Sequence, residues 1–269
     1  MKPWQGAPPP ELPKPNALGY VLVALRFVGL ATTFFGILPF VLLLRTAGAP
    51  VSAARLASFA TRMGLRVIGL RLVLHGRPDM AASACVANHG SWIDTLVLNA
   101  AHQVRFVSKS DVAGWPLIGF LARAMNTVFI ERRRTAAGAQ KEQMRALIDE
   151  GSRPLFFPEG TSTDSLRVIP FRSSLFESFL AAGGDDITIQ PVSVRYIAPK
   201  GQLPSFYGWW GGMTFVPHFM AVMSRVRQGS VHVSFLDVLP VSSFEDRKAL
   251  AQAAEKAVRE GFDQLSRDL

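Results

Sequence analysis

The feature that most constrains the fold is an almost uninterrupted apolar run over residues 17–44, in which Arg26 is the only charged side chain. A membrane-spanning helix needs about 20 apolar residues, so this run is long enough to cross a bilayer. Pro39 lies within it, and we expect the helix to kink there. A single spanning helix, a kinked re-entrant helix and the buried helix of a soluble fold all remain open. A cleaved signal peptide is disfavoured, because the run is too long and begins too late.

The segments that flank this run differ in composition. Residues 1–16 hold six prolines and predict a non-helical tail. Residues 51–66 place arginines between apolar residues and predict an amphipathic helix. Its basic side faces lipid headgroups, or it is an ordinary helix packed on the main domain, and the two interpretations are compatible. Since Arg is more frequent after the apolar run than before it, the positive-inside tendency predicts that the main domain lies at the cytoplasmic face of the inner (cell) membrane.

The composition of the 269-residue chain excludes several classes of protein. With 49% hydrophobic residues the chain is too apolar to be disordered, and its one cysteine, Cys85, excludes a disulfide scaffold. A single long apolar run argues against a polytopic membrane protein. The net charge of +9 suits an anionic membrane surface or a nucleic acid. No nucleic-acid-binding motif is visible and the basic residues gather near the apolar run, so we favour the membrane.

From residue 71 onward, short strands alternate with helices, which predicts an α/β fold with a central sheet. Strands are expected near residues 71–76, 82–88, 104–109, 127–132, 153–158, 187–196 and 230–239. Helices are expected over residues 91–101, 115–125, 135–150, 173–182 and 244–267. Pro191 has no N–H to donate to a sheet ladder, so we place it at an edge or an end of the sheet.

The chain divides into three parts on this pattern. A Pro-rich tail covers residues 1–16, a membrane-anchoring helical region covers residues 17–70, and the main domain covers residues 71–269. Within the main domain, the aromatic and apolar segment 203–226 is either a hydrophobic loop and helix near lipid or part of the core. We slightly favour the core.

A histidine and a carboxylate lie five residues apart where an expected strand turns into an expected helix. His89 follows the strand and Asp94 falls in the first helical turn, so the two side chains can meet. A carboxylate that accepts the proton of one ring nitrogen leaves the other nitrogen free as a general base. Ser91 and Asp94 also form a helix-capping pattern, which explains these two residues but not His89.

Three further segments place polar or turn residues at expected strands. Residues 127–134 end in a run of charges, residues 158–162 place Glu159 beside a glycine turn, and residues 189–193 contain a strand proline. Open α/β sheets bind ligands at the carboxyl ends of their strands, so Glu159 is a candidate site residue. Taken singly, each segment is equally explained as an ordinary turn or edge strand.

Taken together and in order, the motifs NHGSWID, FIERR, FPEGTS and IQPVSV resemble the four sequence blocks of the PlsC-like lysophospholipid (glycerolipid) acyltransferase family. The resemblance covers roughly residues 70–240, and the apolar N-terminal run resembles the family's membrane anchor. It implies a mixed sheet flanked by helices, and an O-acyltransferase that moves a fatty acyl group from an acyl carrier protein or coenzyme A thioester to the free hydroxyl of a lyso-lipid. The implied partners are the bilayer, the lyso-lipid and the acyl donor; no metal, further cofactor or nucleic acid is implied.

The resemblance also implies roles for individual residues. His89 would remove the proton of the acceptor hydroxyl, Asp94 would orient His89, and the hydroxyl would attack the thioester directly, without an acyl-enzyme. Cys85, in an apolar strand, is then a core residue rather than a nucleophile. A pair of backbone N–H groups around Gly160 would stabilise the oxyanion. Acceptor binding would fall to Glu131, Arg132, Glu159, Gly160, Thr161, Ser162, Asp164 and Arg172.

The sequence departs from the commonest family pattern at two positions. Glu131 stands where Asp is usual, and Ser162 stands where 1-acylglycerol-3-phosphate acyltransferases usually have Arg. An Arg there suits a dianionic phosphate, so its absence favours a zwitterionic lyso-lipid, and we lean to lyso-ornithine lipid. Asp164 would meet an ammonium, and Arg167 or Arg172 would meet a carboxylate or phosphate.

Two alternatives to this function remain. The first is a 1-acylglycerol-3-phosphate O-acyltransferase that makes phosphatidic acid, with the phosphate held by the arginines at positions 132–134. The second is a membrane-bound adaptor without activity, which explains the anchor and the charge but not His89 together with Glu159. A serine hydrolase is not supported, since the chain has no G-x-S-x-G motif.

Overall fold

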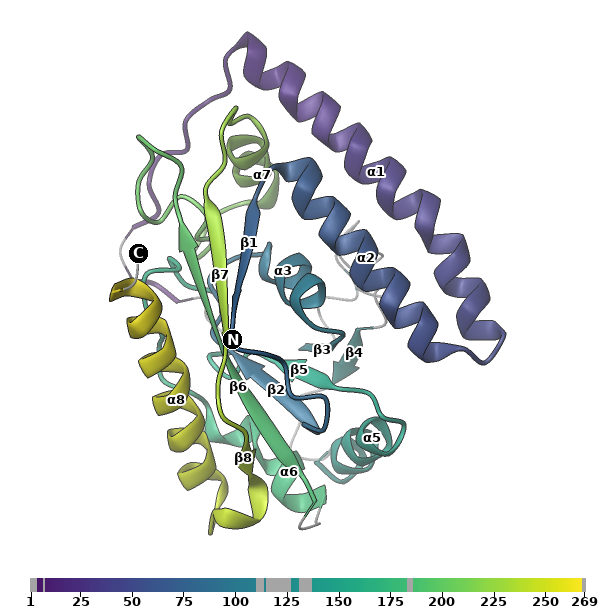
Figure 1. The fold of residues 1–269 in the computed structure, drawn as a ribbon. Helices are drawn as coiled ribbons and strands as arrows, with labels where there is room; N and C mark the ends of the chain where they lie inside the picture. The colour runs from purple at the N-terminus through teal and green to yellow at the C-terminus, as the bar shows by residue number, and fades with distance from the viewer. Residues whose placement is uncertain are drawn as a thin grey trace.

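The computed structural model describes residues 4–6, 8–109, 114, 127–130, 137–182 and 186–267. Within these residues the chain forms a mixed α/β fold, with helices on both faces of one sheet (Figure 1). The strands are β1 (Arg71–His75), β2 (Ala84–Ala87), β3 (Arg105–Lys109), β4 (Val128–Ile130), β5 (Pro154–Phe156), β6 (Thr188–Ile197), β7 (Ser230–Phe235) and β8 (Leu239–Pro240). The helices are α1 (Ala17–Thr46), α2 (Pro50–Ile68), α3 (Asp94–Ala101), α5 (Ala137–Asp149), α6 (Glu177–Ala182), α7 (Phe215–Met223) and α8 (Arg247–Arg267), with single 3₁₀ turns at Ser173–Leu175 and Val241–Ser243.

The described elements fall where the sequence predicts them, with bounds that differ by a few residues. Every expected strand is present, and β8 is a short addition that pairs with β6. The helix expected over residues 115–125 lies outside the described residues. The segment 203–226 contains α7, in which His218 is fully buried while Val216 is 65% exposed. Part of the segment is therefore core, as we favour, and the proximity of its exposed part to lipid stays a prediction.

The sheet brings three strand ends together. Its order is β1-β7-β6-β2-β5-β3-β4. β2 runs parallel to its neighbours β5 and β6, whereas β7 is antiparallel to β6 and parallel to β1. The carboxyl ends of β2, β5 and β6 therefore meet at one edge, which is where open α/β sheets bind ligands. His89, Glu159 and Tyr196 all lie at or near this edge.

Pro191 corrects one expectation. β6 is an interior strand rather than an edge strand, and Pro191 lies within it, opposite Val86 of β2. On the other side of β6, β7 pairs from Val192 onward, while β8 pairs with Thr188 and Ile189. The proline thus falls in the gap between two partner strands, where the antiparallel ladder needs no N–H from it. Pro191 still lies where no backbone N–H is needed, as expected for proline, but the sequence does not indicate a gap between two partner strands.

The sheet separates two apolar cores, because side chains alternate between its faces. In β2, Cys85 and Ala87 face the core shared with α2, α3 and α7, while Ala84 and Val86 face the core shared with α5, α6 and α8. All four residues are fully buried, as a central parallel strand requires. Burial raises the pKa of the Cys85 thiol to about 12, so Cys85 is the core residue that the sequence predicts.

Helix α1 is long, apolar and mostly uncovered. It forms a hairpin with α2 and continues through Pro39, so the expected kink does not interrupt the helix (Figure 1). Within the described residues it is the one helix long and apolar enough to cross a membrane, yet only 6% of its most apolar window is buried. The core helix of a soluble protein would be mostly buried, so that interpretation of residues 17–44 is wrong.

Candidate active site

His89 and Asp94 meet as the sequence predicts. His89 lies in the loop that leaves β2, Asp94 is the first residue of α3, and His89 Nδ1 lies 2.7 Å from Asp94 Oδ2. The Asp94 side chain is fully buried, whereas that of His89 is 20% exposed. When Nδ1–H donates to the carboxylate, the lone pair of Nε2 is left free to accept a proton. The pair therefore has the arrangement of a general base and its orienting carboxylate.

Three further donors hold the Asp94 carboxylate. The backbone N–H groups of Gly90 and Ser91 donate to Oδ2 at 2.9 and 3.0 Å, and the Tyr196 hydroxyl donates to Oδ1 at 2.6 Å. These bonds fix the position of the carboxylate, which is shielded from water. Ser91 Oγ also accepts the N–H of Ile93 at 3.3 Å. The capping interpretation of Ser91 and Asp94 therefore holds alongside the contact with His89.

Two aromatic residues that the sequence analysis does not single out complete the surroundings of His89. The imidazole stacks on the Phe157 ring, with centroids 4.0 Å apart and an interplanar angle of 14°. Burial, together with the nearby Asp94 charge, raises the pKa of Tyr196 well above its usual range, so its hydroxyl remains a donor. Phe157 follows β5 and Tyr196 lies near the end of β6. The order of strands around β2, had it been known, would have pointed to both.

Glu159 holds the loop that carries His89. Its carboxylate accepts the backbone N–H of His89 at 2.6 Å and that of Ile169 at 2.8 Å, and the residue is 1% exposed. Burial raises the pKa of this carboxyl to about 8, against the lowering effect of the two N–H donors. Both oxygens of Glu159 are thus engaged in supporting the His89 loop, and a part of this residue in acceptor binding stays a prediction.

The turn after Glu159 narrows the choice of backbone N–H groups that could stabilise an oxyanion around Gly160. Gly160 has φ of +73°, a left-handed conformation that favours glycine. Its N–H donates to the carbonyl oxygen of Phe157 at 3.0 Å. The Gly160 N–H is therefore already used within the turn and is not free to stabilise an oxyanion.

The loop beyond this turn packs directly against the His89 loop. The Thr163 N–H donates to the His89 carbonyl oxygen at 2.9 Å. A Cβ on Gly90 would lie 2.6 Å from the Cβ of Ser165, so only glycine permits this approach. The fit of the two loops fixes residues 161–165 beside His89.

The expected acceptor residues on this loop have unequal access. Thr161 and Ser162 are partly exposed. Asp164 is 2% exposed and forms a two-point ion pair with Arg167, at 2.8 Å from Oδ2 to Nη2 and 3.2 Å from Oδ1 to Nε. Because its charge is already compensated, Asp164 does not offer the free carboxylate that we expected to meet an ammonium. Arg172 is exposed, with its Nε donating to the carbonyl oxygen of Glu159 at 3.2 Å.

Part of the expected site lies outside the described residues. This holds for Glu131 and Arg132 and for the arginines at positions 133 and 134, so their part in acceptor binding stays a prediction. Among the residues that are described, no group of three or more His, Cys, Asp or Glu side chains is placed to hold a metal ion.

Known proteins resemble this chain in sequence and in fold. Residues 74–195 match a family model described as Acyltransferase. A lyso-ornithine lipid O-acyltransferase of Rhodobacter capsulatus is 43% identical over 98% of both chains. A 1-acyl-sn-glycerol-3-phosphate acyltransferase of Neisseria meningitidis is 28% identical over 64% of this chain and 66% of its own. The crystal structure of PlsC, the 1-acyl-sn-glycerophosphate acyltransferase of Thermotoga maritima, has the same fold, with a TM-score of 0.67 and 19% identity over 92% of this chain and 96% of its own.

These relatives bear the names of two different acceptors, which match the acceptor that we favour and its alternative. Each of them is named as an enzyme, so a non-catalytic adaptor is not supported. Because the similarity to one of them extends over 98% of both chains, the whole chain can be assigned. It belongs to the PlsC-like lyso-lipid acyltransferase family and is an O-acyltransferase that transfers an acyl group from an acyl donor to a lipid acceptor.

Proposed function

We propose that this enzyme transfers a fatty acyl group to the free hydroxyl of lyso-ornithine lipid and so produces ornithine lipid. The identity of the acceptor is inferred from the 43% identity, over 98% of both chains, with a lyso-ornithine lipid O-acyltransferase. The relative named for a phosphate acceptor is more distant, at 28% identity over 64% of this chain. It supports the alternative, a 1-acylglycerol-3-phosphate O-acyltransferase.

The proposed mechanism uses His89 as the general base. Nε2 removes the proton of the acceptor hydroxyl while the oxygen attacks the thioester carbonyl carbon. The tetrahedral intermediate collapses, the carbon–sulfur bond breaks, and the leaving thiolate takes the proton back from Nε2. Asp94 stabilises the imidazolium that forms between these steps, and Tyr196 keeps the carboxylate in place. No acyl-enzyme is needed.

The oxyanion of the intermediate needs donors other than Gly160. The N–H of Gly160 is bound to Phe157, and those of Gly90 and Ser91 are bound to Asp94. We assign this role to the next N–H groups along the loop, those of Thr161 and Ser162. Donors of this kind are fixed before the charge develops, so they stabilise the transition state more than the ground state.

The charge near the acceptor loop fits a headgroup that carries a single carboxylate. The Arg167 side chain is 51% exposed and forms an ion pair with Asp164. Arg172, which follows a few residues later in the same loop, is also exposed. Ser162 adds no cation to this pair. A dianionic phosphate would require more positive charge than such an arrangement offers, whereas a carboxylate is matched by one guanidinium.

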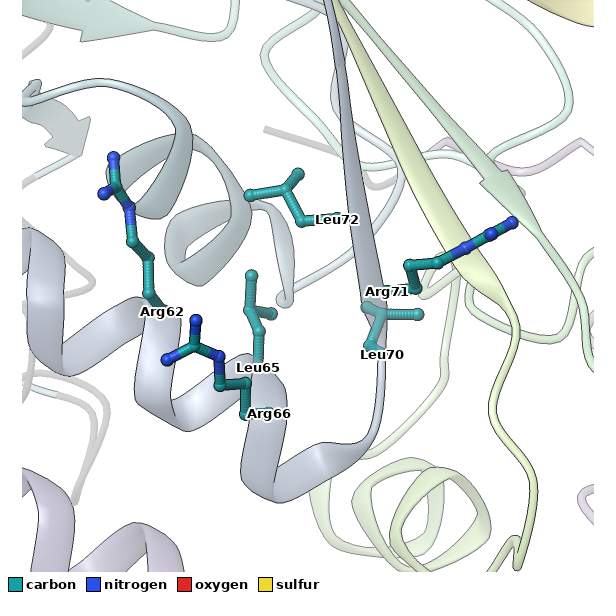
Figure 2. A pocket seen from close by; sticks show the side chains of 6 residues that line it. All are labelled: Arg62, Leu65, Arg66, Leu70, Arg71 and Leu72. Atoms are coloured by element: carbon teal, nitrogen blue, oxygen red, sulfur yellow. The ribbon is translucent and has the colours of Figure 1, made fainter.

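A basic surface on α2 supports attachment to anionic lipid. Arg62, Arg66 and Arg71 line an open hollow of about 330 Å³ together with apolar side chains of Leu65, Leu70 and Leu72. Figure 2 shows Arg62 and Arg66 side by side on α2, whereas Arg71 points to the other side of β1. Guanidinium groups above an apolar floor suit the boundary between headgroups and acyl chains. We propose that this face of α2 meets the membrane.

Contacts at both ends of α1 favour a hairpin over a spanning helix. Before α1, the backbone N–H of Trp4 donates to Thr161 Oγ1 at 3.2 Å. After α1, the chain returns through α2 to β1. Arg26, the one charge of the apolar run, donates to the carbonyl oxygens of Met223 and Arg225 at 2.7 and 2.6 Å. Since the chain before α1 and the chain after it both return to the α/β fold, we propose that α1 and α2 enter one leaflet from the cytoplasmic face.

The acyl donor is proposed by class alone. We propose a thioester of acyl carrier protein or coenzyme A, with no other cofactor, because direct transfer needs only a carbonyl activated by a sulfur leaving group.

The test of donor and acceptor uses purified protein in detergent. Each donor is combined with lyso-ornithine lipid or with 1-acylglycerol 3-phosphate, and the products are identified by mass spectrometry. We expect ornithine lipid with at least one donor. Phosphatidic acid without ornithine lipid would instead establish the alternative.

Membrane topology is tested with single cysteines in intact cells. Cys85 is buried, so it contributes little labelling of its own. Cysteine is introduced by Gln5→Cys in the tail and by Lys200→Cys on the α/β fold, both at exposed positions, and a membrane-impermeant maleimide is applied. The hairpin predicts that both sites label only after the membrane is opened. Labelling of Gln5→Cys alone in intact cells would show that α1 spans the bilayer.

A further inference from the structure

The N-terminal tail reaches the active-site loop through Trp4. The backbone N–H of Trp4 donates to Thr161 Oγ1, and its ring lies 5.3 Å from the guanidinium carbon of Arg167. The same ring packs against Trp210, with centroids 6.4 Å apart. Figure 1 shows the tail, in purple, running from the start of α1 along the side of the α/β fold. A residue remote in sequence thus becomes part of the wall beside the FPEGTS motif.

The composition of the tail suits a fixed, extended course. Proline fixes its own φ and reduces the number of conformations of the unfolded chain, so a proline-rich segment loses less conformational entropy when it is ordered. Pro9 packs against the loop between β6 and α7, where a Cβ on Gly211 would lie 3.5 Å from Pro9 Cγ. The tail ends at Asn16, whose side chain accepts the N–H of Gly19 at 2.8 Å and caps α1. The course of the tail after Trp4 is therefore supported by contacts at Pro9 and at Asn16.

Arg167 is the cation that this arrangement orients. Asp164 binds two of its nitrogen atoms, Nε and Nη2, and the Trp4 ring covers the guanidinium. The side chain is nevertheless 51% exposed, so its remaining N–H donors are within reach of a ligand. A guanidinium that is held before binding loses little side-chain entropy when an anionic group arrives.

We propose that Trp4 is a specificity-determining positioning residue that holds Arg167 and Thr161 for the carboxylate of the acceptor headgroup. The proposal rests on the proposed function and deepens it. It also accounts for Ser162: the cation that phosphate-using relatives would carry at that position is replaced by Arg167, whose charge Asp164 already shares. Such a shared charge suits a singly charged carboxylate better than a dianionic phosphate.

The test compares Trp4→Ala, Trp4→Phe and the control Gln5→Ala, a neighbouring exposed position, in the full-length protein. We expect Trp4→Ala to raise the KM for lyso-ornithine lipid about tenfold, since it removes a cation–π contact and loosens the tail. Its kcat and its KM for the acyl donor should change less than about twofold, because Trp4→Ala keeps the backbone N–H that donates to Thr161 Oγ1 and leaves the groups around His89 untouched. Trp4→Phe keeps an aromatic face and should restore most of the affinity, and Gln5→Ala should match the wild type.

The outcomes separate this inference from the proposed function. An unchanged acceptor KM in Trp4→Ala, or an equal loss in kcat and in both KM values, would overturn the positioning role and leave the acyltransferase reaction in place. A wild-type enzyme that does not acylate lyso-ornithine lipid would overturn the proposed function itself. A Trp4→Phe variant as impaired as Trp4→Ala would also contradict the role of the aromatic face.

Discussion

At the base end of the site, formed by His89, Asp94 and Tyr196, the polar contacts are short and the carboxylate is fully buried. At the headgroup end, formed by Trp4, Thr161 and Arg167, the contacts are longer and Arg167 is half exposed. The base end comes from β6 and from the turn between β2 and α3. The headgroup end joins the N-terminal tail to the loop after β5.

This difference fits a fold that serves several acceptors. In the proposed mechanism the base end transfers protons, which depends on short distances, so it needs a fixed geometry. The proposed headgroup end needs only to match the charge and shape of a ligand, and exposed side chains can change without disturbing the sheet. Relatives named for different acceptors are what such a division allows.

The largest expected effect is at the base end. His89→Ala should lower kcat by about 10²–10⁴-fold, because the acceptor hydroxyl loses its base. The KM for lyso-ornithine lipid should change little, since the headgroup end is intact. Ser91→Ala is the matched control from the same loop: it should cost about 1 kcal/mol of stability through a weakened cap, with kcat retained. Steady-state kinetics and thermal unfolding of both variants measure the two effects.

A change at the headgroup end should alter selectivity rather than rate. Ser162→Arg adds a guanidinium where a phosphate can use it, and a hydrogen bond to a charged group contributes about 1.5–3 kcal/mol. The ratio of kcat/KM for 1-acylglycerol 3-phosphate over lyso-ornithine lipid should therefore rise by about one to two decades. Ser162→Ala is the control. An unchanged ratio would mean that position 162 does not face the headgroup.

A smaller effect is expected from the hydroxyl that supports Asp94. Tyr196→Phe removes the 2.6 Å bond to Oδ1 while His89 and two backbone N–H groups still hold Oδ2. We expect kcat to fall about fivefold, with acceptor KM unchanged. Tyr207→Phe, which removes a hydroxyl bonded to Gln228 away from Asp94, is the control. If both variants lose kcat equally, Tyr196 acts on stability alone.

The smallest effect concerns pH and the support of the His89 loop. Burial raises the pKa of Glu159 to about 8, from an ordinary value of 4.5. Between these values the folded protein holds a proton that the unfolded chain releases, so this group's contribution to stability is lost as pH rises through about 8. The Tm in detergent should therefore fall less between pH 6 and 9 in Glu159→Gln than in wild type. Glu260→Gln, an exposed control, should follow wild type; an equal fall in all three proteins would contradict the assignment.

His89 and Asp94 of the base end could be predicted from the sequence because they are local. They are five residues apart at a strand-to-helix turn, where the two side chains can meet. The alternation of strands and helices likewise predicts the sheet. The interior position of Pro191 could not be predicted, because it depends on where β7 ends and β8 begins.

At the headgroup end, Thr161 and Arg167 were expected from the sequence, whereas Trp4 could not be predicted because its place depends on a contact distant in sequence. The contact of Trp4 with Thr161 joins residues 157 positions apart, and nothing in the tail indicates its course. The burial of Asp164 and Glu159 also depends on how loops pack, so both appeared from sequence to be free carboxylates. Tyr196 was missed because an aromatic residue in a strand is most often simply core.

The most direct test of the acceptor assignment is a competition in one reaction. Wild-type enzyme receives an acyl donor together with equal amounts of lyso-ornithine lipid and 1-acylglycerol 3-phosphate, and the initial ratio of the two products gives the ratio of kcat/KM values. We predict that ornithine lipid exceeds phosphatidic acid by about tenfold or more, the difference that one mismatched charge contact produces. A product ratio in favour of phosphatidic acid would contradict the assignment.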